Sequence, residues 1–147
     1  MQPFIQVLHA KDHWVTITNY NPFFDPQFSL GLWFVYDSLN RPDFYLPFLK
    51  PALKRLSFNA NRFVVRTCKL TPQYGYTDCG LFALGYAIAI AERKDPAKIA
   101  FNQSVMQHQF NWMIEKSIVI QFNHSMIDND PVYTEHEIDT SDVNLIY

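Results

Sequence analysis

The sequence is poor in the residues on which several protein classes depend. Only two of its 147 residues are cysteine, Cys68 and Cys79, which excludes a scaffold built on disulfides. These cysteines and the five histidines are dispersed without the spacing of zinc ligands, so we expect neither a metal nor another cofactor. The longest strongly apolar run, residues 81–91, is far shorter than the roughly 20 residues that cross a bilayer.

The chain also lacks the signs of secretion and of disorder. Residues 1–8 show neither the charged segment nor the small-residue cleavage site of a secretory signal. Hydrophobic residues form 48% of the chain and aromatic residues 16%, so a packed core is expected. A chain of 147 residues without internal repeats corresponds to one domain. We therefore expect a soluble intracellular protein that does not associate with membranes.

Charge is unevenly distributed along the chain. Residues 1–116 contain all 12 Lys and Arg and 8 of the 14 acidic residues, whereas residues 117–147 contain 6 acidic residues and no Lys or Arg. We interpret residues 123–147 as a poorly ordered acidic tail, the alternative being an arm that folds back on the basic body. The basic residues between positions 41 and 69 are too scattered for a nucleic-acid interface, although they can steer an acidic protein partner.

Runs of β-branched and aromatic residues alternate with turn signals and apolar helical patterns. The sequence predicts strands at residues 4–9, 14–20, 32–37 and 63–70. It predicts helices at residues 79–93 and 102–116, and a helix at 41–58 that Pro47 and Pro51 interrupt. Loops are expected at Asn21-Pro22, at Asp25-Pro26 and at residues 71–78, and little order is expected after Phe122.

Cys79 opens the apolar helix expected at residues 79–93, a position that favours a thiolate. Exposed backbone N–H groups and the helix dipole stabilise negative charge there. Thr77 or Asp78 can cap this helix. The side-chain amide of Gln73, six residues before the cysteine, can stabilise an oxyanion together with the backbone N–H of Cys79.

His13 and Asp37 lie on two expected strands that a loop joins, so an antiparallel pairing is the economical arrangement. If Val15 faces Val35, then His13 faces Asp37 with the two Cβ atoms about 5 Å apart. The carboxylate then accepts the imidazole N–H and fixes the tautomer that leaves the other nitrogen basic. The sequence thus contains the parts of an activated thiol nucleophile.

Each of these residues also has a purely structural interpretation. A lone cysteine such as Cys79 is more often a small buried hydrophobe than a nucleophile. His13 can bridge strands, Asp37 can begin a turn with the serine after it, and Gln73 can be an ordinary loop residue. Cys68 lies inside an expected strand with no basic partner, and we interpret it as structural. The four residues together are less expected by chance than any one of them alone.

Three phrases of the sequence resemble the ubiquitin-like-protein-specific cysteine proteases, the SUMO (sentrin) protease family. They are VLHAKDHWV at residues 7–15, VYDSL at residues 35–39, and the glutamine at 73 followed by DCGLF at residues 78–82. In that family a His-Trp pair carries the general base, a Tyr/Phe-Asp-Ser phrase the acid, and a Gln-x5-Cys-Gly phrase the oxyanion donor and the nucleophile. Residues 101–110 are similar to the helix after the catalytic core in transposon- or virus-associated members.

The resemblance implies a role for each matched residue. His13 is the base, Asp37 the acid that orients it, Gln73 the oxyanion donor and Cys79 the nucleophile. Trp14 matches the family tryptophan that packs over the Gly-Gly tail of the substrate. The implied partner is a ubiquitin-like modifier or its conjugates.

The resemblance also implies a fold and an activity. The fold is α+β and papain-like, with a mixed, mainly antiparallel sheet packed on a buried helix that carries the nucleophile. The catalytic core is expected at residues 1–122, N-terminally short because family members carry a further portion before the His-Trp strand. The expected activity is cysteine-dependent hydrolysis of the peptide or isopeptide bond after the C-terminal Gly-Gly of a ubiquitin-like modifier, in the nucleus or cytoplasm.

Two other functions stay open. Acetyltransferases with the same core use the cysteine to carry an acetyl group, and they need a site for acetyl-CoA and often one for an inositol phosphate. A relative without catalytic activity would bind a ubiquitin-like protein and leave it uncleaved.

Overall fold

The computed structural model describes residues 3–21, 31–128 and 130–144. The loop expected at Asn21-Pro22 and Asp25-Pro26 falls outside them, apart from Asn21. The strands of the described part are β1 (Ile5–Ala10), β2 (His13–Thr18), β3 (Leu32–Tyr36), β4 (Arg62–Cys68), β5 (Ile99–Phe101), β6 (His124–Met126) and β7 (Tyr133–Asp139). The helices are α1 (Pro42–Leu56), α2 (Cys79–Ala91), α3 (Gln103–Lys116) and a short 3₁₀ turn, η1 (Pro96–Lys98).

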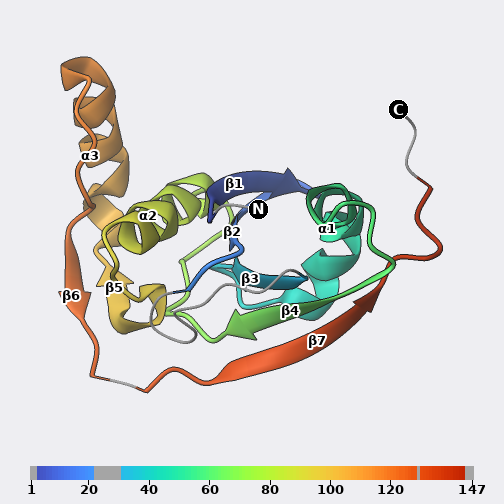
Figure 1. Ribbon diagram of the computed structural model, residues 1–147. Coiled ribbons are helices and arrows are strands. Elements are labelled where there is room, and N and C mark those ends of the chain that lie inside the picture. The colour runs from blue at the N-terminus through green and yellow to red at the C-terminus, as the bar shows by residue number, and fades with distance from the viewer. Residues whose placement is uncertain (1–2, 22–30, 129, 145–147) are drawn as a thin grey trace.

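One mixed sheet of five strands organises the described part of the chain, in the order β1-β2-β3-β4-β7 (Figure 1). Neighbouring strands are antiparallel except for β3 and β4, which are parallel. A parallel pair requires a crossover connection, and α1 provides it. β5 and β6 form a separate antiparallel pair. The chain therefore has an α+β architecture, and the expected mixed, mainly antiparallel sheet is confirmed.

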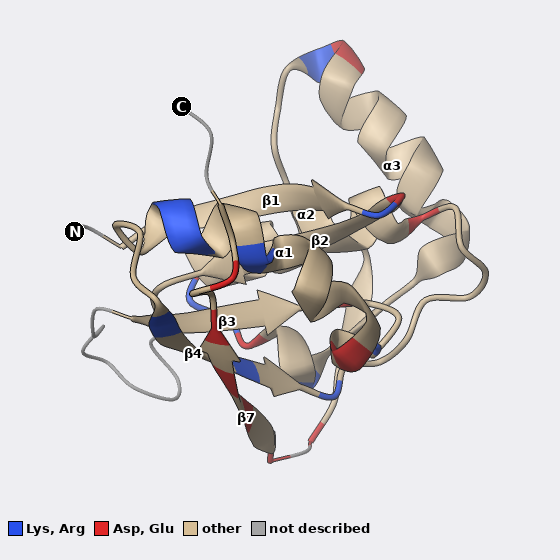
Figure 2. Ribbon diagram, turned by 90° about the vertical axis from the view of Figure 1, so that its right-hand side faces the viewer, with Lys and Arg blue, Asp and Glu red and all other residues tan. Residues whose placement is uncertain are grey.

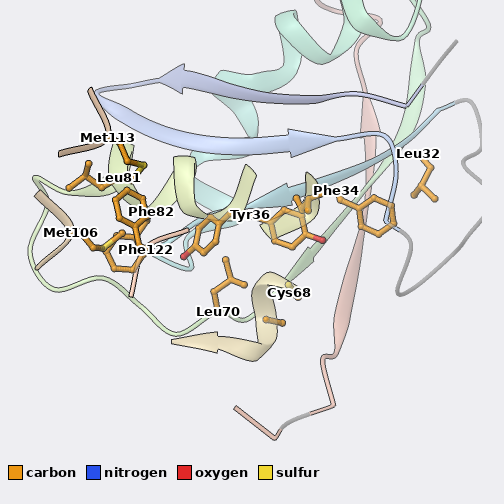
Figure 3. Packing of buried hydrophobic residues seen from close by; sticks show 13 residues of the cluster. Leu32, Phe34, Tyr36, Cys68, Leu70, Leu81, Phe82, Met106, Met113 and Phe122 are labelled. Atoms are coloured by element: carbon orange, nitrogen blue, oxygen red, sulfur yellow. The ribbon is translucent and has the colours of Figure 1, made fainter. Parts of the chain in front are cut away.

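Helices α1 and α2 cover opposite faces of this sheet, because the side chains of a strand point alternately to its two faces. Val35 of β3 lies in one buried cluster with Leu49 of α1. Its neighbour Tyr36 lies in a second cluster with Phe82 of α2, which Figure 3 shows. α3 projects away from the sheet beyond α2 (Figure 1). No helix in the described part of the chain has the length and apolar character needed to cross a bilayer.

The four expected strands and the helices expected at residues 79–93 and 102–116 are present, each end within two residues of its expected position. The prediction that Pro47 and Pro51 interrupt α1 was wrong, since the helix is continuous. Both prolines lie outside the buried side of α1, where water can satisfy the carbonyl groups that lose a hydrogen-bond donor. Burial of the opposite side, which includes Leu49 and Leu53, stabilises the helix against that loss.

The expectation of little order after Phe122 was also wrong. β7 pairs with the whole length of β4, and Ile138 is part of the buried cluster beneath α1. Its acidic residues lie beside basic residues of β4 (Figure 2), as in the 2.7 Å ion pair between Glu135 and Arg66. Lys54 of α1 then donates a 2.7 Å hydrogen bond to the carbonyl that follows β7, at residue 140. High charge indicated a tail, but these charges are exposed or paired while Ile138 is buried.

Candidate active site

His13 and Asp37 meet at one end of the sheet. β2 begins with His13, and its antiparallel neighbour β3 ends one residue before Asp37. Both residues therefore lie at the same end of the sheet. The expected register was wrong by two residues, because Val35 faces Ile17 rather than Val15. A shift of two residues keeps every side chain on its original face, and diagonal neighbours remain within reach of one another. His13 Nε2 and Asp37 Oδ1 lie 2.6 Å apart.

The carboxylate of Asp37 is buried and held by several donors. Oδ1 also accepts a 2.9 Å hydrogen bond from the backbone N–H of Leu39, and Oδ2 accepts one of 2.9 Å from Arg41. Burial acts to raise the pKa of Asp37, but the hydrogen bonds from His13 and these two N–H groups outweigh it and leave the pKa below its ordinary value. An ionised Asp37 accepts the Nε2 proton, so Nδ1 is the nitrogen of His13 left to act as a base.

Cys79 is the first residue of α2, as the sequence predicts. Asp78 occupies the N-cap position, yet no described side chain caps the helix. The Asp78 carboxylate instead accepts a 2.8 Å hydrogen bond from Nε2 of Gln103. The N-terminal N–H groups of α2 therefore remain available to negative charge at Cys79. Within the described residues, Cys79 and His13 share no hydrogen bond in this structure.

Trp14 connects β2, which begins with His13, to α2, which begins with Cys79. The residues of β2 alternate, so His13 faces α1 while Trp14 faces α2. The indole lies so close to α2 that a Cβ placed on Gly80 would be 3.4 Å from Trp14 Cδ1. One turn further along, Thr16 Oγ1 donates a 2.5 Å hydrogen bond to the carbonyl of Ala83. The residues next to His13 and Cys79 are thus in contact, which fixes β2 against the start of α2.

A shallow groove borders this contact. It has a volume of about 460 Å³ and is open to solvent over the indole of Trp14, whose side chain is 42% exposed. Its walls come from β1, β2, α2, α3 and the loop before α2, through Val7, Trp14, Thr77, Gly80, Leu81, Leu84 and Phe110. An extended and largely apolar segment of another chain can lie in such a groove.

Gln73 is buried at the start of the loop before α2 and contacts the residue after Asp37. Ser38 Oγ donates to Gln73 Oε1, and the backbone N–H of Gln73 donates to the carbonyl of Ser38 at 3.1 Å. Gln73 Nε2 donates to the carbonyl of Gly75 at 3.1 Å. The oxyanion donor expected from the sequence therefore lies beside the acid, held by two hydrogen bonds to Ser38.

Four residues of this site were not among the site residues expected from the sequence. Ser38 binds Gln73 at the start of the loop before α2, and Asn40 binds the chain just before that loop, at residue 70. Gln103, at the start of α3, binds the loop itself at residue 74. Tyr45 of α1 packs on the ring of His13, with the ring centroids 4.3 Å apart. The hydrogen bonds of Ser38, Asn40 and Gln103 join residues 29 to 35 positions apart in the sequence. The ring contact joins Tyr45 to His13, 32 positions away. No local sequence pattern could reveal contacts of this range.

Both cysteines are buried, but Cys68 lies in a different part of the fold from Cys79. It lies within β4 and is buried in the cluster beneath α2 (Figure 3). Burial, and then the charge of Asp95, raises the pKa of the Cys68 thiol to about 12. The thiol stays protonated at neutral pH, consistent with a structural role. Within the described residues, no group of three or more His, Cys, Asp or Glu side chains could hold a metal ion.

No protein-family model, curated protein or solved structure matches this chain. A functional conclusion therefore depends on the geometry of the site. At one end of the sheet lie an ionised carboxylate, an imidazole that binds it through Nε2, a thiol at a helix start and a buried amide. Groups of these kinds are the ones that acyl transfer through a thiol requires.

Proposed function

We propose that this chain is a cysteine-type peptidase with a papain-like core, related to the ubiquitin-like-protein-specific (SUMO) proteases. It hydrolyses the peptide or isopeptide bond after the C-terminal Gly-Gly of a ubiquitin-like modifier. The observation that carries the proposal is the 2.6 Å contact between His13 Nε2 and Asp37 Oδ1, at the sheet end where α2 presents Cys79. A buried carboxylate that accepts several N–H donors has the environment of an orienting acid.

The proposed reaction has two steps. His13 Nδ1 takes the thiol proton, and the Cys79 sulfur attacks the carbonyl carbon of the second glycine of the Gly-Gly tail. A tetrahedral oxyanion forms, which the Gln73 amide and the N–H groups at the start of α2 stabilise. The C–N bond then breaks, and His13 gives its proton to the departing amine. Water activated by the same imidazole releases the modifier from the thioester and restores the thiol.

The preference for glycine follows from the surface next to Cys79. The Trp14 indole lies against Gly80 and flanks the groove that begins there. A substrate tail that passes over this indole to reach the thiol has little room for side chains. Glycine removes that conflict and also adopts extended conformations that other residues avoid. Both precursor processing and deconjugation from lysine use this same tail.

The proposal is tested with a panel of ubiquitin-like modifiers that carry an electrophile in place of the C-terminal carboxylate. We expect a covalent adduct with at least one modifier, and we expect Cys79→Ala to abolish it. Cys68→Ala is the matched control and should form the adduct at the wild-type rate, because Cys68 lies at the end of β4 in the cluster beneath α2 and its thiol has a raised pKa. Binding of a modifier without an adduct would instead identify a non-catalytic module. Acetylation of Cys79 by acetyl-CoA would identify a transferase.

A further inference from the structure

The turn that follows β3 binds both halves of the proposed catalytic machinery. Asp37 holds His13 through the 2.6 Å contact, and the next residue, Ser38, holds Gln73. The Ser38 hydroxyl donates to Gln73 Oε1, and the Ser38 carbonyl accepts the backbone N–H of Gln73 at 3.1 Å. Ser38 is 1% exposed and Gln73 is 6% exposed, so water does not compete for either contact.

The contact at Oε1 decides which way the Gln73 amide points. A glutamine amide carries an acceptor oxygen on one side and two N–H donors on the other. With Oε1 fixed on Ser38, Nε2 is turned away from the serine, and one of its N–H groups reaches the carbonyl of Gly75 at 3.1 Å. The second N–H is then the donor left for an oxyanion. Rotation of the amide by half a turn would put the oxygen there and repel a developing negative charge.

Asn40 fixes the same turn against the chain that leads to Gln73. Its Oδ1 accepts the backbone N–H of Leu70 at 2.9 Å, and its Nδ2 donates to the Leu70 carbonyl at 2.8 Å. Asn40 itself has a φ of 52°, a left-handed conformation that asparagine tolerates better than most residues. The turn and residues 70–73 thus form one hydrogen-bonded unit, which preserves the approach of Ser38 to Gln73.

We propose that Ser38 is a positioning residue that orients the Gln73 amide for oxyanion stabilisation, so that two consecutive residues set the base and the oxyanion donor. This inference rests on the proposed function, because it assigns a role within that reaction. Ser38 acts only through Gln73 and does not touch the substrate. Removal of its hydroxyl should therefore lower the rate of the chemical step and leave substrate binding unchanged.

The test is a double-mutant cycle on Ser38→Ala and Gln73→Ala. The substrate is the modifier that labels the wild-type protein, joined at its C-terminus to a fluorogenic amine. We expect Ser38→Ala to lower kcat about tenfold with little change in KM, a smaller loss than the hundredfold or more typical when an oxyanion donor is removed. In the Gln73→Ala background the same change should have no further effect on kcat.

Ser57→Ala is the matched control, since Ser57 is also buried and its hydroxyl accepts a 2.7 Å hydrogen bond from Trp33 Nε1 on the other side of the sheet. It should lower stability without lowering kcat. Equal losses from Ser38→Ala in both backgrounds, or a loss that Ser57→Ala reproduces, would overturn the inference and leave the proposed function intact. If the wild-type protein reacts with no modifier, the proposed function fails and the role of Ser38 fails with it.

Discussion

The imidazole of His13 lies against the phenol ring of Tyr45, with ring centroids 4.3 Å apart and planes inclined by 32°. Tyr45 comes from α1, on the face of the sheet opposite α2, and it is buried. Burial, followed by the charge of Asp37, raises the pKa of the Tyr45 hydroxyl, so the phenol stays neutral at physiological pH. Asp37 fixes His13 at one ring nitrogen, and Tyr45 limits rotation of the ring out of its plane.

Tyr45→Ala should therefore reduce kcat about tenfold, because a base that rotates freely is seldom aligned with the thiol. Tyr45→Phe keeps the ring and should stay within about twofold of the wild-type kcat. Steady-state kinetics of both variants on the fluorogenic modifier provide the measurement, with urea unfolding to confirm that each folds. Equal losses in the two variants would show that the hydroxyl, and not the ring, supports His13.

Alternation along strands made the pairing of His13 and Asp37 predictable from the sequence. The side-chain period of a strand is two, so both residues face the same way in the expected register and in the observed one, where Val35 faces Ile17. The start of α2 at Cys79 was predictable for a similar reason, because an uninterrupted apolar run follows it. Both features depend on the local pattern of apolar residues, which a single sequence contains.

The remaining features depend on tertiary contacts that leave no periodic signal. Ser38 and Gln73 are 35 positions apart, and the parallel pairing of β3 with β4 brings their segments together. The strand β7 was hidden by its net charge, although Ile138 within it is buried. Asp78, one of the two residues expected to cap α2, occupies the N-cap position, but its carboxylate binds Gln103 instead of the helix. In each case a contact with a distant segment overrides the local preference.

Low pH should destabilise the fold, partly because Asp37 becomes protonated. Its pKa is lowered in the folded state, so the unfolded chain binds the proton more tightly. Asp37 therefore contributes stability above its ordinary pKa of about 3.9, and this contribution is lost as pH falls through the folded-state value. The raised pKa of Asp95 acts in the opposite direction.

Urea unfolding of the wild-type protein and of Asp37→Asn, measured between about pH 5 and pH 2, isolates this contribution. The effect of Asp95 is common to both proteins and cancels in the difference. We expect the wild-type protein to be the more stable at the upper end, with a difference that shrinks as the pH falls. A difference that stays constant over this range would contradict the ionised, hydrogen-bonded state of Asp37.

The two cysteines should react very differently with iodoacetamide. Only thiolates react at useful rates, and the pKa of about 12 at Cys68 leaves almost none at mildly alkaline pH. We expect Cys79 to be alkylated in the native protein while Cys68 is protected, as peptide mass spectrometry can establish. Both should be modified in urea, which is the control for intrinsic reactivity. Both thiols are buried in the folded protein, so modification of native Cys68 before Cys79 would contradict the assignment of Cys79 as the reactive thiol.

Gln103 should matter for activity although it is not one of the four expected catalytic residues. Its Oε1 accepts the backbone N–H of Tyr74 at 2.7 Å, and its Nε2 donates to the Tyr74 carbonyl at 2.9 Å and to Asp78 at 2.8 Å. Gln103→Ala frees the loop between Gln73 and Cys79, and we expect kcat to fall about tenfold as both catalytic groups lose their fixed separation.

Gln107→Ala is a close control for this change. It removes the same side chain from the same helix, but among the described residues the amide of Gln107 bonds Asn111 of α3 alone, at 3.1 Å. We expect kcat for this variant to match that of the wild-type protein. Steady-state kinetics of Gln103→Ala and Gln107→Ala, measured side by side, provide the test. Similar losses of kcat in the two variants would attribute the effect to α3 rather than to the loop.

Gly85→Ala should destabilise the protein even though alanine favours helices. A Cβ at this position of α2 would lie 2.5 Å from Phe101 Cζ, far inside van der Waals contact. Phe101 cannot withdraw easily, because its ring packs edge-on against Phe82 and Phe122. Overpacking of this kind costs about 1–3 kcal/mol, against a gain of about 1 kcal/mol from the helix propensity of alanine.

Urea unfolding should therefore show a lower free energy of unfolding for Gly85→Ala than for the wild-type protein. Phe101→Leu supplies the critical comparison, since the smaller side chain vacates the space that the new methyl group needs. In that background, Gly85→Ala should be neutral or stabilising, because only the helix propensity term remains. If Gly85→Ala is destabilising by the same amount in both backgrounds, the close approach of β5 to α2 is not the cause.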